Sequence, residues 1–283
     1  MNKSLFSELY YKVFQSGNRL YLFIGINVLV FLAINLFAAG EFLFAGNTAG
    51  ADWLTQQVSM PAYWAAVPYK FWTIITYMFT QRGFFHILFN MLWLYWLGTI
   101  FLDFLNKRQF TFTYLAGGTM GGLLYLLAYN TLPVFSRAAE NSFLLGSSAS
   151  VMAIVVATAT LVPDFTIRLL FFGAVRLKYL ALVYFVLDII GMGGGNPGGS
   201  IAHIGGALLG FIYIKQLNKG NDLSNIIKNK RKLKVVKNTK GSSTNISVSD
   251  QEVIDQILDK ISKSGYESLS KTEKEQLFKA SKK

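Results

Sequence analysis

Apolar stretches separated by short polar connections fill most of the first 218 residues. Several are apolar over roughly the length that a helix needs to cross a membrane, which is about 20 residues. The pattern predicts six transmembrane helices, at Leu20–Ala39, Phe84–Phe104, Thr111–Tyr129, Leu144–Val162, Lys178–Met192 and Ser200–Ile214. The last two are short by hydropathy alone. The first exceeds the apolar core of about 7 to 15 residues found in signal peptides, and we therefore expect it to remain as an uncleaved helix.

Composition agrees with a polytopic membrane protein. Hydrophobic residues make up 52% of the 283-residue chain, and its mean hydropathy is +0.38. Cysteine is absent, which excludes disulfides, thiolate metal sites and a cysteine nucleophile. Because the chain has only two histidines, we expect no zinc site, and no metal or organic cofactor is required by the chemistry considered below.

Lysine and arginine are unevenly distributed over the connections between these predicted helices. With the amino terminus inside, the inner segments carry Lys3, Lys12, Arg19, Lys107, Arg108, Arg168, Arg176 and Lys178. The outer segments carry only Lys70, Arg82 and Arg137. Positive residues favour the cytoplasmic side, so we expect both termini in the cytoplasm and the chain in the inner (cytoplasmic) membrane.

This topology places several polar residues at comparable depth. His86, Ser148 and His203 each lie near the outer start of the second, fourth and sixth predicted helices, and Asn90 follows His86 by one helical turn. Polar groups inside a membrane span are costly and usually functional. Their shared level suggests a catalytic site within the outer half of the bilayer.

Three motifs containing these residues resemble those of one known family. They are G-x-S at Gly146–Ser148, H-x-x-x-N at His86–Asn90, and A-H-x-G-G-x-x-x-G at Ala202–Gly210. In this order they resemble the rhomboid intramembrane serine proteases, over roughly residues 20 to 215, and the segment beginning at Trp72 resembles the family's first loop. The resemblance implies an all-α polytopic fold built as a six-helix bundle.

Serine and histidine suit peptide hydrolysis because a hydroxyl becomes nucleophilic only when a base takes its proton. The residues alone do not separate the two histidines. The resemblance assigns Ser148 as nucleophile and His203 as base, in a dyad without a carboxylate. It assigns His86, Asn90 and the Ser148 backbone N–H to an oxyanion hole. Asp188 is the one acid that could be a third member, and we favour instead a carboxyl near the outer interface or paired with a neighbour.

Other positions add expectations about packing. Gly206 and Gly210 have the small-xxx-small spacing that lets helices approach closely, which would bring the fourth and sixth helices together. Asn27 and Asn35 are expected to form interhelical hydrogen bonds. The aromatic-rich connection 42–83 is expected to lie partly in the outer leaflet, and the glycine-rich segment 193–199 is expected to be a mobile cap.

Two departures from the resembled family also stand out. Thr73 follows Trp72 where many members carry arginine, so the usual hydrogen bonds that brace the first loop are not expected in the same form. Met152 occupies the position, one turn after the nucleophile, where an aromatic residue often supports the base. Neither change removes a reacting group.

The chain beyond residue 218 is different in character. We divide the sequence into a cytoplasmic segment 1–19, a transmembrane domain 20–218, a basic and polar linker 219–249 and a helical hairpin 250–283. The basic cluster 228–240 favours anionic lipid headgroups over nucleic acid. The hairpin has apolar residues at helical spacing and a capping box from Ser270 to Glu273. It resembles an appendage on rhomboids of Bacteroidetes-type bacteria, and we infer no activity for it.

The prediction is thus an all-α rhomboid-like endopeptidase that cleaves transmembrane protein substrates near the outer membrane boundary. The alternative is an inactive rhomboid-like protein that binds membrane clients, against which the retained serine, histidines and asparagine argue. A transporter is less favoured because we see no internal repeat.

Overall fold

The computed structural model describes residues 4–169, 173–227 and 248–281. It divides into a membrane unit, Met1–Asn229, and a C-terminal unit, Lys230–Lys283. The basic cluster 228–240 and residues 241–247 of the predicted linker lie outside the described residues.

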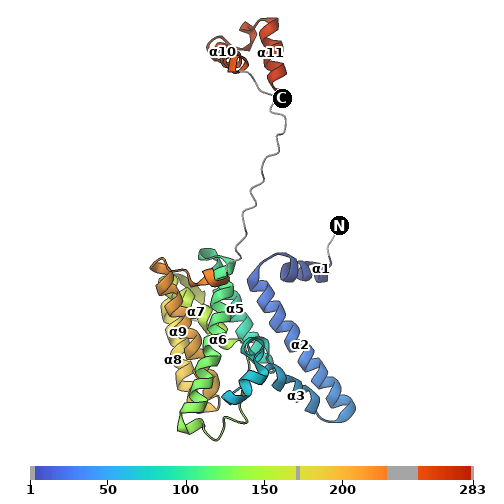
Figure 1. Ribbon diagram of the computed structural model, residues 1–283, viewed down its shortest axis with the longest axis vertical. Coiled ribbons are helices and arrows are strands. Elements are labelled where there is room, and N and C mark those ends of the chain that lie inside the picture. Colours follow the sequence, from blue (N-terminus) through green and yellow to red (C-terminus); the bar gives the residue numbers. More distant parts are fainter. Residues whose placement is uncertain (1–3, 170–172, 228–247, 282–283) are drawn as a thin grey trace. The chain divides into compact units, whose positions relative to one another are not determined.

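The membrane unit is a helical bundle (Figure 1). Its longer helices are α2 (Arg19–Ala45), α5 (Phe84–Phe104), α6 (Lys107–Thr131), α7 (Ser148–Leu161), α8 (Leu177–Ile190) and α9 (Pro197–Asn218). They occupy the positions of the six predicted apolar stretches. In the part of the chain that the structure describes, α2, α5, α6 and α9 are long and apolar enough to cross a membrane, whereas α7 and α8 have 14 residues each. The all-α prediction is confirmed.

Most of the predicted boundaries differ from the observed ones by a few residues, and two of these differences have a clear local cause. The fourth helix begins at Ser148 and not at Leu144, because strand β2 (Phe143–Leu144) pairs antiparallel with β1 (Met60–Pro61) before the chain turns at Gly146. The sixth begins at Pro197, inside the segment predicted as a loop. Proline suits the first helical position, and the Asn196 side chain caps the helix by accepting from the Gly199 backbone N–H at 3.1 Å.

The remaining elements of the membrane unit are short. Before α2 lie α1 (Leu5–Tyr10) and the π-helix η1 (Tyr11–Gln15). The long connection after α2 contains α3 (Ala49–Val58), β1, the 3₁₀ helix η2 (Trp64–Lys70), α4 (Thr73–Thr76) and the 3₁₀ turn η3 (Tyr77–Phe79). Later connections contain the 3₁₀ helices η4 (Pro133–Phe135), η5 (Gly191–Gly194) and η6 (Leu223–Ile227), and the hairpin of β3 (Thr166–Leu169) with β4 (Gly173–Arg176).

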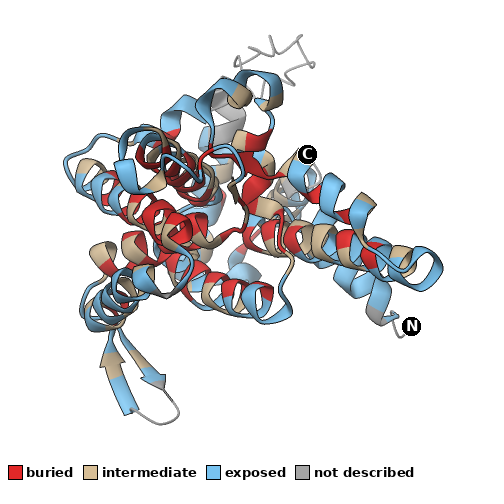
Figure 2. Cartoon of the chain, turned by 90° about the horizontal axis from the view of Figure 1, so that it is seen from below, coloured by how far each residue is buried: buried red, intermediate tan, exposed pale blue. Residues whose placement is uncertain are grey.

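Buried residues gather where the helices of the bundle face one another (Figure 2), and the helices that pack most closely are α6, α7 and α9. A Cβ atom added to Gly206 would lie 2.1 Å from the Ala149 carbonyl oxygen, and one added to Gly210 would lie 2.3 Å from that of Ala153. The backbones of α7 and α9 are therefore in direct contact, which confirms the close approach predicted from the glycine spacing. No larger side chain fits between them without a shift of one helix.

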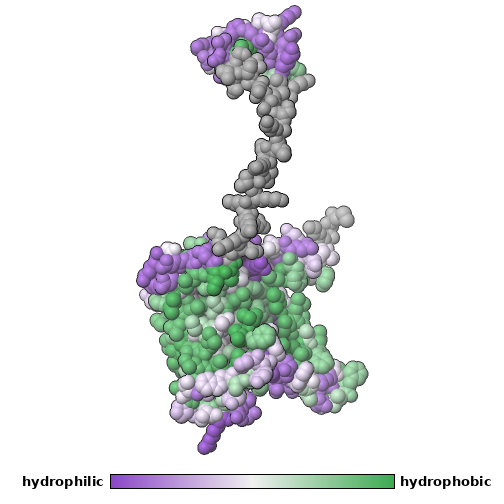
Figure 3. Space-filling model, in the orientation of Figure 1, coloured by the Kyte–Doolittle hydropathy of each residue, from purple (hydrophilic) through white to green (hydrophobic). Residues whose placement is uncertain are grey.

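The outer surface of this unit is apolar over the helices and hydrophilic at both ends (Figure 3). Exposed side chains of α2 and α8 contribute to the apolar zone, for example Leu36 at 68% and Leu187 at 61% exposure. A surface of this kind suits hydrocarbon and not water. The membrane unit is thus a multi-pass membrane domain.

The C-terminal unit contains two helices, α10 (Val248–Ser264) and α11 (Lys271–Ser281), joined through the 3₁₀ turn η7 (Tyr266–Ser268). Gly265, with a φ of 78°, ends α10. The predicted capping box is present: the Ser270 backbone N–H donates to Glu273 Oε2 at 2.7 Å, and the Glu273 N–H donates to Ser270 Oγ at 3.3 Å. Hydrogen bonds from Lys260 and Ser270 lower the pKa of Glu273 to about 2.

Candidate active site

Ser148 is the first residue of α7 and follows a sharp turn. Gly146 has a φ of 117°, which glycine adopts without strain, and its backbone N–H donates to the Tyr77 carbonyl at 2.9 Å. A Cβ atom added to Gly146 would lie 2.9 Å from His86 Cε1 and 3.7 Å from Ser148 Oγ. The His86 ring and the Ser148 hydroxyl therefore border the same glycine, and only a residue without a side chain leaves space between them.

His203 lies in the second turn of α9, on the side that faces α7. A Cβ atom added to Gly121 of α6 would lie 2.6 Å from Ala149 Cβ and 2.6 Å from the Ala202 carbonyl oxygen. One glycine of α6 thus contacts the chain neighbours of both Ser148 and His203. The first turn of α7 and the second turn of α9 meet at this point, and both side chains are partly buried there.

The structure places Asp188, in the last turn of α8, directly against His203. Its Oδ1 is 2.7 Å from His203 Nδ1, and both side chains are 13% exposed. The prediction favoured a carboxyl near the outer interface or paired with a neighbour over a third member of the site, and the structure shows that its partner is His203 itself. The four-residue turn η5 is too short to carry the end of α8 away from the start of α9, so the carboxylate faces the imidazole. The other ring nitrogen, His203 Nε2, has no hydrogen-bond partner among the described residues.

Asn90 is buried on α5, one turn beyond His86, and belongs to a polar network. Its side-chain amide donates to Gln81 Oε1 at 3.0 Å, and Gln81 Nε2 donates to Asn27 Oδ1 at 2.9 Å and to Ser147 Oγ at 3.1 Å. This contact uses one of the two Asn90 amide hydrogens and fixes the direction of the side chain.

Gln81 is a central residue that sequence reasoning missed. It is fully buried and joins α2, α5 and the turn before α7 through the network above. The available signal was an uncharged amide immediately before the second span, with His86 five residues later. An amide accepts and donates at once, so Gln81 can fix the orientation of Asn90.

The asparagines of α2 have different roles. Asn27 donates to Tyr114 Oη on α6 at 3.1 Å, which confirms an interhelical hydrogen bond. Asn35 instead donates to the Phe31 carbonyl of its own helix at 2.9 Å, so the interhelical prediction is wrong for that residue. A helix can satisfy a polar side chain internally when no partner lies opposite.

The first loop is braced without the arginine that the resembled family often carries. The Trp72 indole N–H donates to the Gln57 carbonyl at 2.7 Å, and buried Thr73 donates to the Lys70 carbonyl at 2.6 Å. Arg82 pairs with Asp52 of α3, and hydrogen bonds from Arg82 and Thr48 lower the pKa of Asp52. These contacts fasten the loop next to Gln81. Met152, the other departure, is fully buried in α7.

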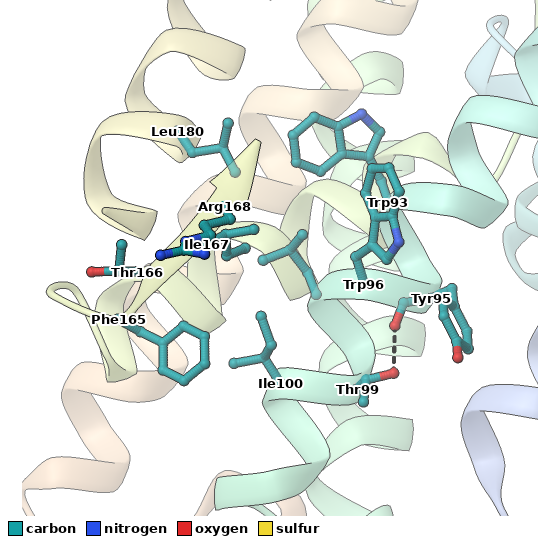
Figure 4. Close-up of a pocket in the computed structure, with 11 residues that line it drawn as sticks. Trp93, Tyr95, Trp96, Thr99, Ile100, Phe165, Thr166, Ile167, Arg168 and Leu180 are labelled. Carbon is teal, nitrogen blue, oxygen red and sulfur yellow. Dashed lines mark hydrogen bonds between the residues drawn. The ribbon is translucent and has the colours of Figure 1, made fainter. Parts of the chain in front are cut away.

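A separate cavity of about 810 Å³ opens between α5, β3 and α8 (Figure 4). Aromatic and aliphatic side chains line it, with Arg168 as its charged member, and Trp93 on its wall also stacks on Tyr184 of α8 at a ring-centroid distance of 5.0 Å. None of the four predicted site residues lines this cavity. Within the described ranges, no group of three or more His, Asp or Glu side chains is arranged to hold a metal.

Comparison with known proteins connects these features to a family. The Rhomboid domain matches residues 68–219, which contain the three motifs, and a Family of unknown function (DUF6576) matches residues 247–283. The chain is similar to the RHOMBOID-like protein 12, mitochondrial, of Arabidopsis thaliana, with 31% identity over 158 residues. That alignment covers 52% of this chain and 47% of the plant protein, so the chain spans about half the length of the curated relative it matches.

The matched domain accounts for more than half of the chain and for all of α5 to α9. Members of this family are generally serine proteases, and inactive homologues also occur within it. A multi-pass membrane protein with this domain is a rhomboid-type intramembrane protease or an inactive homologue of one. The chain belongs to the rhomboid family.

Proposed function

We propose that this protein is an intramembrane serine endopeptidase in which Ser148 is the nucleophile and His203 is the general base. The observation that carries the proposal is the position of Gly121 on α6. A Cβ atom added to this glycine would lie 2.6 Å from Ala149 Cβ and 2.6 Å from the Ala202 carbonyl oxygen. Ala149 follows Ser148 and Ala202 precedes His203, so the two reacting side chains project from touching turns. A Ser–His pair in that arrangement has the chemistry of acyl transfer.

The proposed reaction begins when His203 takes the Ser148 proton as the hydroxyl oxygen attacks the substrate carbonyl. His203 then returns the proton to the leaving amine, and water hydrolyses the acyl-enzyme by the same steps in reverse order. No hydrogen bond joins Ser148 to His203 Nε2 in the described part of the chain. Catalytic hydrogen bonds are often longer in a free enzyme and shorten when substrate binds.

The oxyanion formed by this attack requires fixed donors. His86 borders Gly146 beside the Ser148 hydroxyl, Asn90 has a second amide hydrogen besides the one donated to Gln81, and Ser148 contributes its backbone N–H as the first residue of α7. The first turn of a helix leaves its N–H groups without partners inside the helix. We assign these three donors to the oxyanion hole.

Substrates in this proposal are transmembrane proteins cleaved near the outer boundary of the inner membrane. A helical peptide bond is shielded from a nucleophile, so substrates that unwind readily are favoured. Both termini of the enzyme lie in the cytoplasm, and the basic tail contacts anionic lipid headgroups rather than nucleic acid. The second candidate, an inactive rhomboid-like protein that binds membrane clients, would need none of the four polar residues.

A serine-reactive probe separates these two functions. The purified protein in detergent is treated with a fluorophosphonate or isocoumarin, beside Ser148→Ala, His203→Ala and the control Ser150→Ala. Ser150 lies two residues from the nucleophile but is buried against Met78. We expect labelling of the parent and of Ser150→Ala, none of Ser148→Ala, and a loss of at least about 100-fold in labelling rate for His203→Ala. Persistent labelling of Ser148→Ala rejects the nucleophile, and an unlabelled but folded parent favours client binding.

A further inference from the structure

The carboxylate beside the proposed base suggests a role beyond a two-residue mechanism. We infer that Asp188 is a positioning residue for His203: it fixes the tautomer and orientation of the imidazole and stabilises the imidazolium formed during the reaction. The inference rests on the proposed function of Ser148 and His203. It adds a carboxylate to the Ser148–His203 dyad that the resemblance implied.

The geometry determines which nitrogen of His203 carries the proton. A carboxylate only accepts hydrogen bonds, so the 2.7 Å contact between Asp188 Oδ1 and His203 Nδ1 requires the hydrogen on Nδ1. In the neutral ring, Nε2 then has a free lone pair. Nε2 is also the nitrogen without a hydrogen-bond partner among the described residues. The atom that must accept the Ser148 proton is thus held unprotonated.

Burial makes this contact important for the carboxylate as well. Asp188 is only 13% exposed, and its Oδ2 has no hydrogen-bond partner in the described ranges. The partners of Oδ1 are His203 Nδ1 and the Ser200 hydroxyl at 3.3 Å, whose single hydrogen is shared with the Asp188 carbonyl oxygen at 3.1 Å. A buried charge is tolerated when it is paired, and His203 supplies that pairing more fully when it becomes an imidazolium.

In this mechanism one proton moves from Ser148 to His203 Nε2 and then to the leaving amine. When Ser148 attacks, its O–H bond breaks, an Nε2–H bond forms, and positive charge develops on the ring. Asp188 stays ionised throughout and keeps the Nδ1–H hydrogen bond. When the proton leaves Nε2 for the amine, the ring returns to its neutral state with Nδ1–H unchanged. Asp188 therefore contacts no reacting atom and acts only through His203.

A structural alternative explains the same contact differently. Asp188 lies in the last turn of α8 and faces the start of α9, where Ser200 and His203 lie three residues apart on one helix face. The carboxylate could fasten the two helices, aided by the positive end of the α9 dipole. In that case a neutral replacement would lower stability, while turnover per folded molecule would be unchanged.

Kinetics with matched variants distinguish the two roles. Asp188→Asn keeps the side-chain shape but lets an amide hydrogen face Nδ1, which favours the wrong tautomer. We expect kcat on a cleavable transmembrane substrate in detergent to fall by at least about 100-fold with KM changed less than about threefold, given the large effect of the corresponding change in soluble triads. Asp188→Glu should restore part of that loss. The matched control is Asp103→Asn. Asp103 is an exposed acid at the end of α5 opposite to His86, so this variant should keep parental kcat.

Thermal unfolding of each variant is measured beside the kinetics. A fall in kcat at an unchanged melting temperature supports positioning, and so does rescue by glutamate. A lower melting temperature with unchanged kcat per labelled molecule overturns it in favour of helix fastening. A parent that never reacts with the probe overturns the proposed function together with this inference, whereas a reactive parent with a fully active Asp188→Asn overturns the inference alone.

The two histidines also allow a direct spectroscopic test. In protein labelled with ¹⁵N-histidine, the spectrum contains only His86 and His203, and a His86→Gln variant assigns the signals. We expect His203 at neutral pH to carry its hydrogen on Nδ1 and to have a bare Nε2, and we expect Asp188→Ala to lose that preference. A hydrogen on Nε2 of the parent contradicts the inference. This measurement does not depend on any substrate.

Discussion

Helices α7 and α8 have the same length but opposite environments. Each has 14 residues, and α7 buries ten of them whereas α8 buries two, Leu177 and Ala181. Both helices are strongly apolar, so composition alone does not separate them. The difference teaches that in this protein the position of a helix in the bundle, and not its hydrophobicity, determines how firmly it is held.

The cause lies in the neighbours of each helix. Helix α7 is enclosed by α5, α6 and α9, and small residues let these backbones approach. Helix α8 lies at the edge of the unit, where large side chains such as Leu187 face outward. Lipid is as apolar as leucine, so an outward apolar residue costs nothing in a membrane but contributes no packing between helices.

The proposed nucleophile and the inferred positioning residue lie on these two differently packed helices. Ser148 begins the enclosed helix, and Asp188 lies in the last turn of the peripheral one. The nucleophile is therefore fixed by many contacts, whereas the inferred positioning carboxylate depends on the short turn η5 and on its own hydrogen bonds to His203 and Ser200. Motion of α8 would therefore disturb the orientation of His203 before it moved Ser148.

Truncation of one large side chain in each helix tests the contrast most strongly. Met152→Ala in α7 should destabilise the protein by about 2 to 3 kcal/mol, because it leaves a cavity that the surrounding helices cannot fill. Leu187→Ala in α8 should change stability by less than about 0.5 kcal/mol, as expected for an exposed position. Unfolding of both variants in the same detergent measures the difference. Equal losses would show that α8 is packed as firmly as α7.

A glycine pair probes the contact between helices rather than one helix. A Cβ atom at Gly206 meets the Ala149 carbonyl at 2.1 Å, whereas one at Gly191 meets nothing within 4 Å. Gly206→Ala should destabilise the bundle by about 1 to 2 kcal/mol through overpacking, and it should slow probe labelling because α9 carries His203. Gly191→Ala, in the turn after α8, is the control and should retain parental stability and labelling. Normal labelling of Gly206→Ala would show that α7 and α9 can separate without harm to the site.

Much of this arrangement could be predicted from the sequence. Apolar runs located the six longer helices, and the spacing of Gly206 and Gly210 indicated the contact of α7 with α9. These features are local or periodic, so the chain displays them directly. The two 14-residue helices could not be separated in this way, since burial depends on neighbours that are remote in sequence.

Two contacts that the sequence could not specify have the same origin. Asp188 meets His203 only because η5 is tight, and Gln81 joins Asn27, Asn90 and Ser147 only in the folded bundle. Because the resemblance implies a two-residue mechanism, the prediction named Asp188 only as a possible third member of the site. Polar partners in three dimensions carry no periodic signal, whereas hydrophobic faces do.

Two aspartates in the polar connections, one in an enclosed position and one in an exposed position, extend the contrast to electrostatics. Asp222, after α9, pairs with Arg108 of α6 at 2.6 Å and is 17% exposed; Asp164, before α8, pairs with Lys178 at 2.7 Å and is 66% exposed. Burial by itself raises the pKa of Asp222, but hydrogen bonds from Ser224, Tyr213 and Arg108 outweigh it, and the pKa is lowered. The pKa of Asp164 is lowered chiefly by its hydrogen bond from Lys178.

The smallest expected effect on stability comes from neutralising either of these two aspartates. Asp222→Asn should cost about 1 kcal/mol at pH 7, since it weakens a charged hydrogen-bond network at the α6–α9 contact, while Asp164→Asn should change stability little because exposed ion pairs are screened. A carboxyl whose folded pKa lies below the unfolded value of about 3.9 stabilises the protein above that value and loses this effect as the pH falls. The gap in melting temperature between parent and Asp222→Asn should therefore be constant from pH 7 to 5 and shrink below about pH 4. A gap that widens on acidification would contradict the lowered pKa of Asp222, and an equal gap for Asp164→Asn would show that the enclosed ion pair is no stronger than the exposed one.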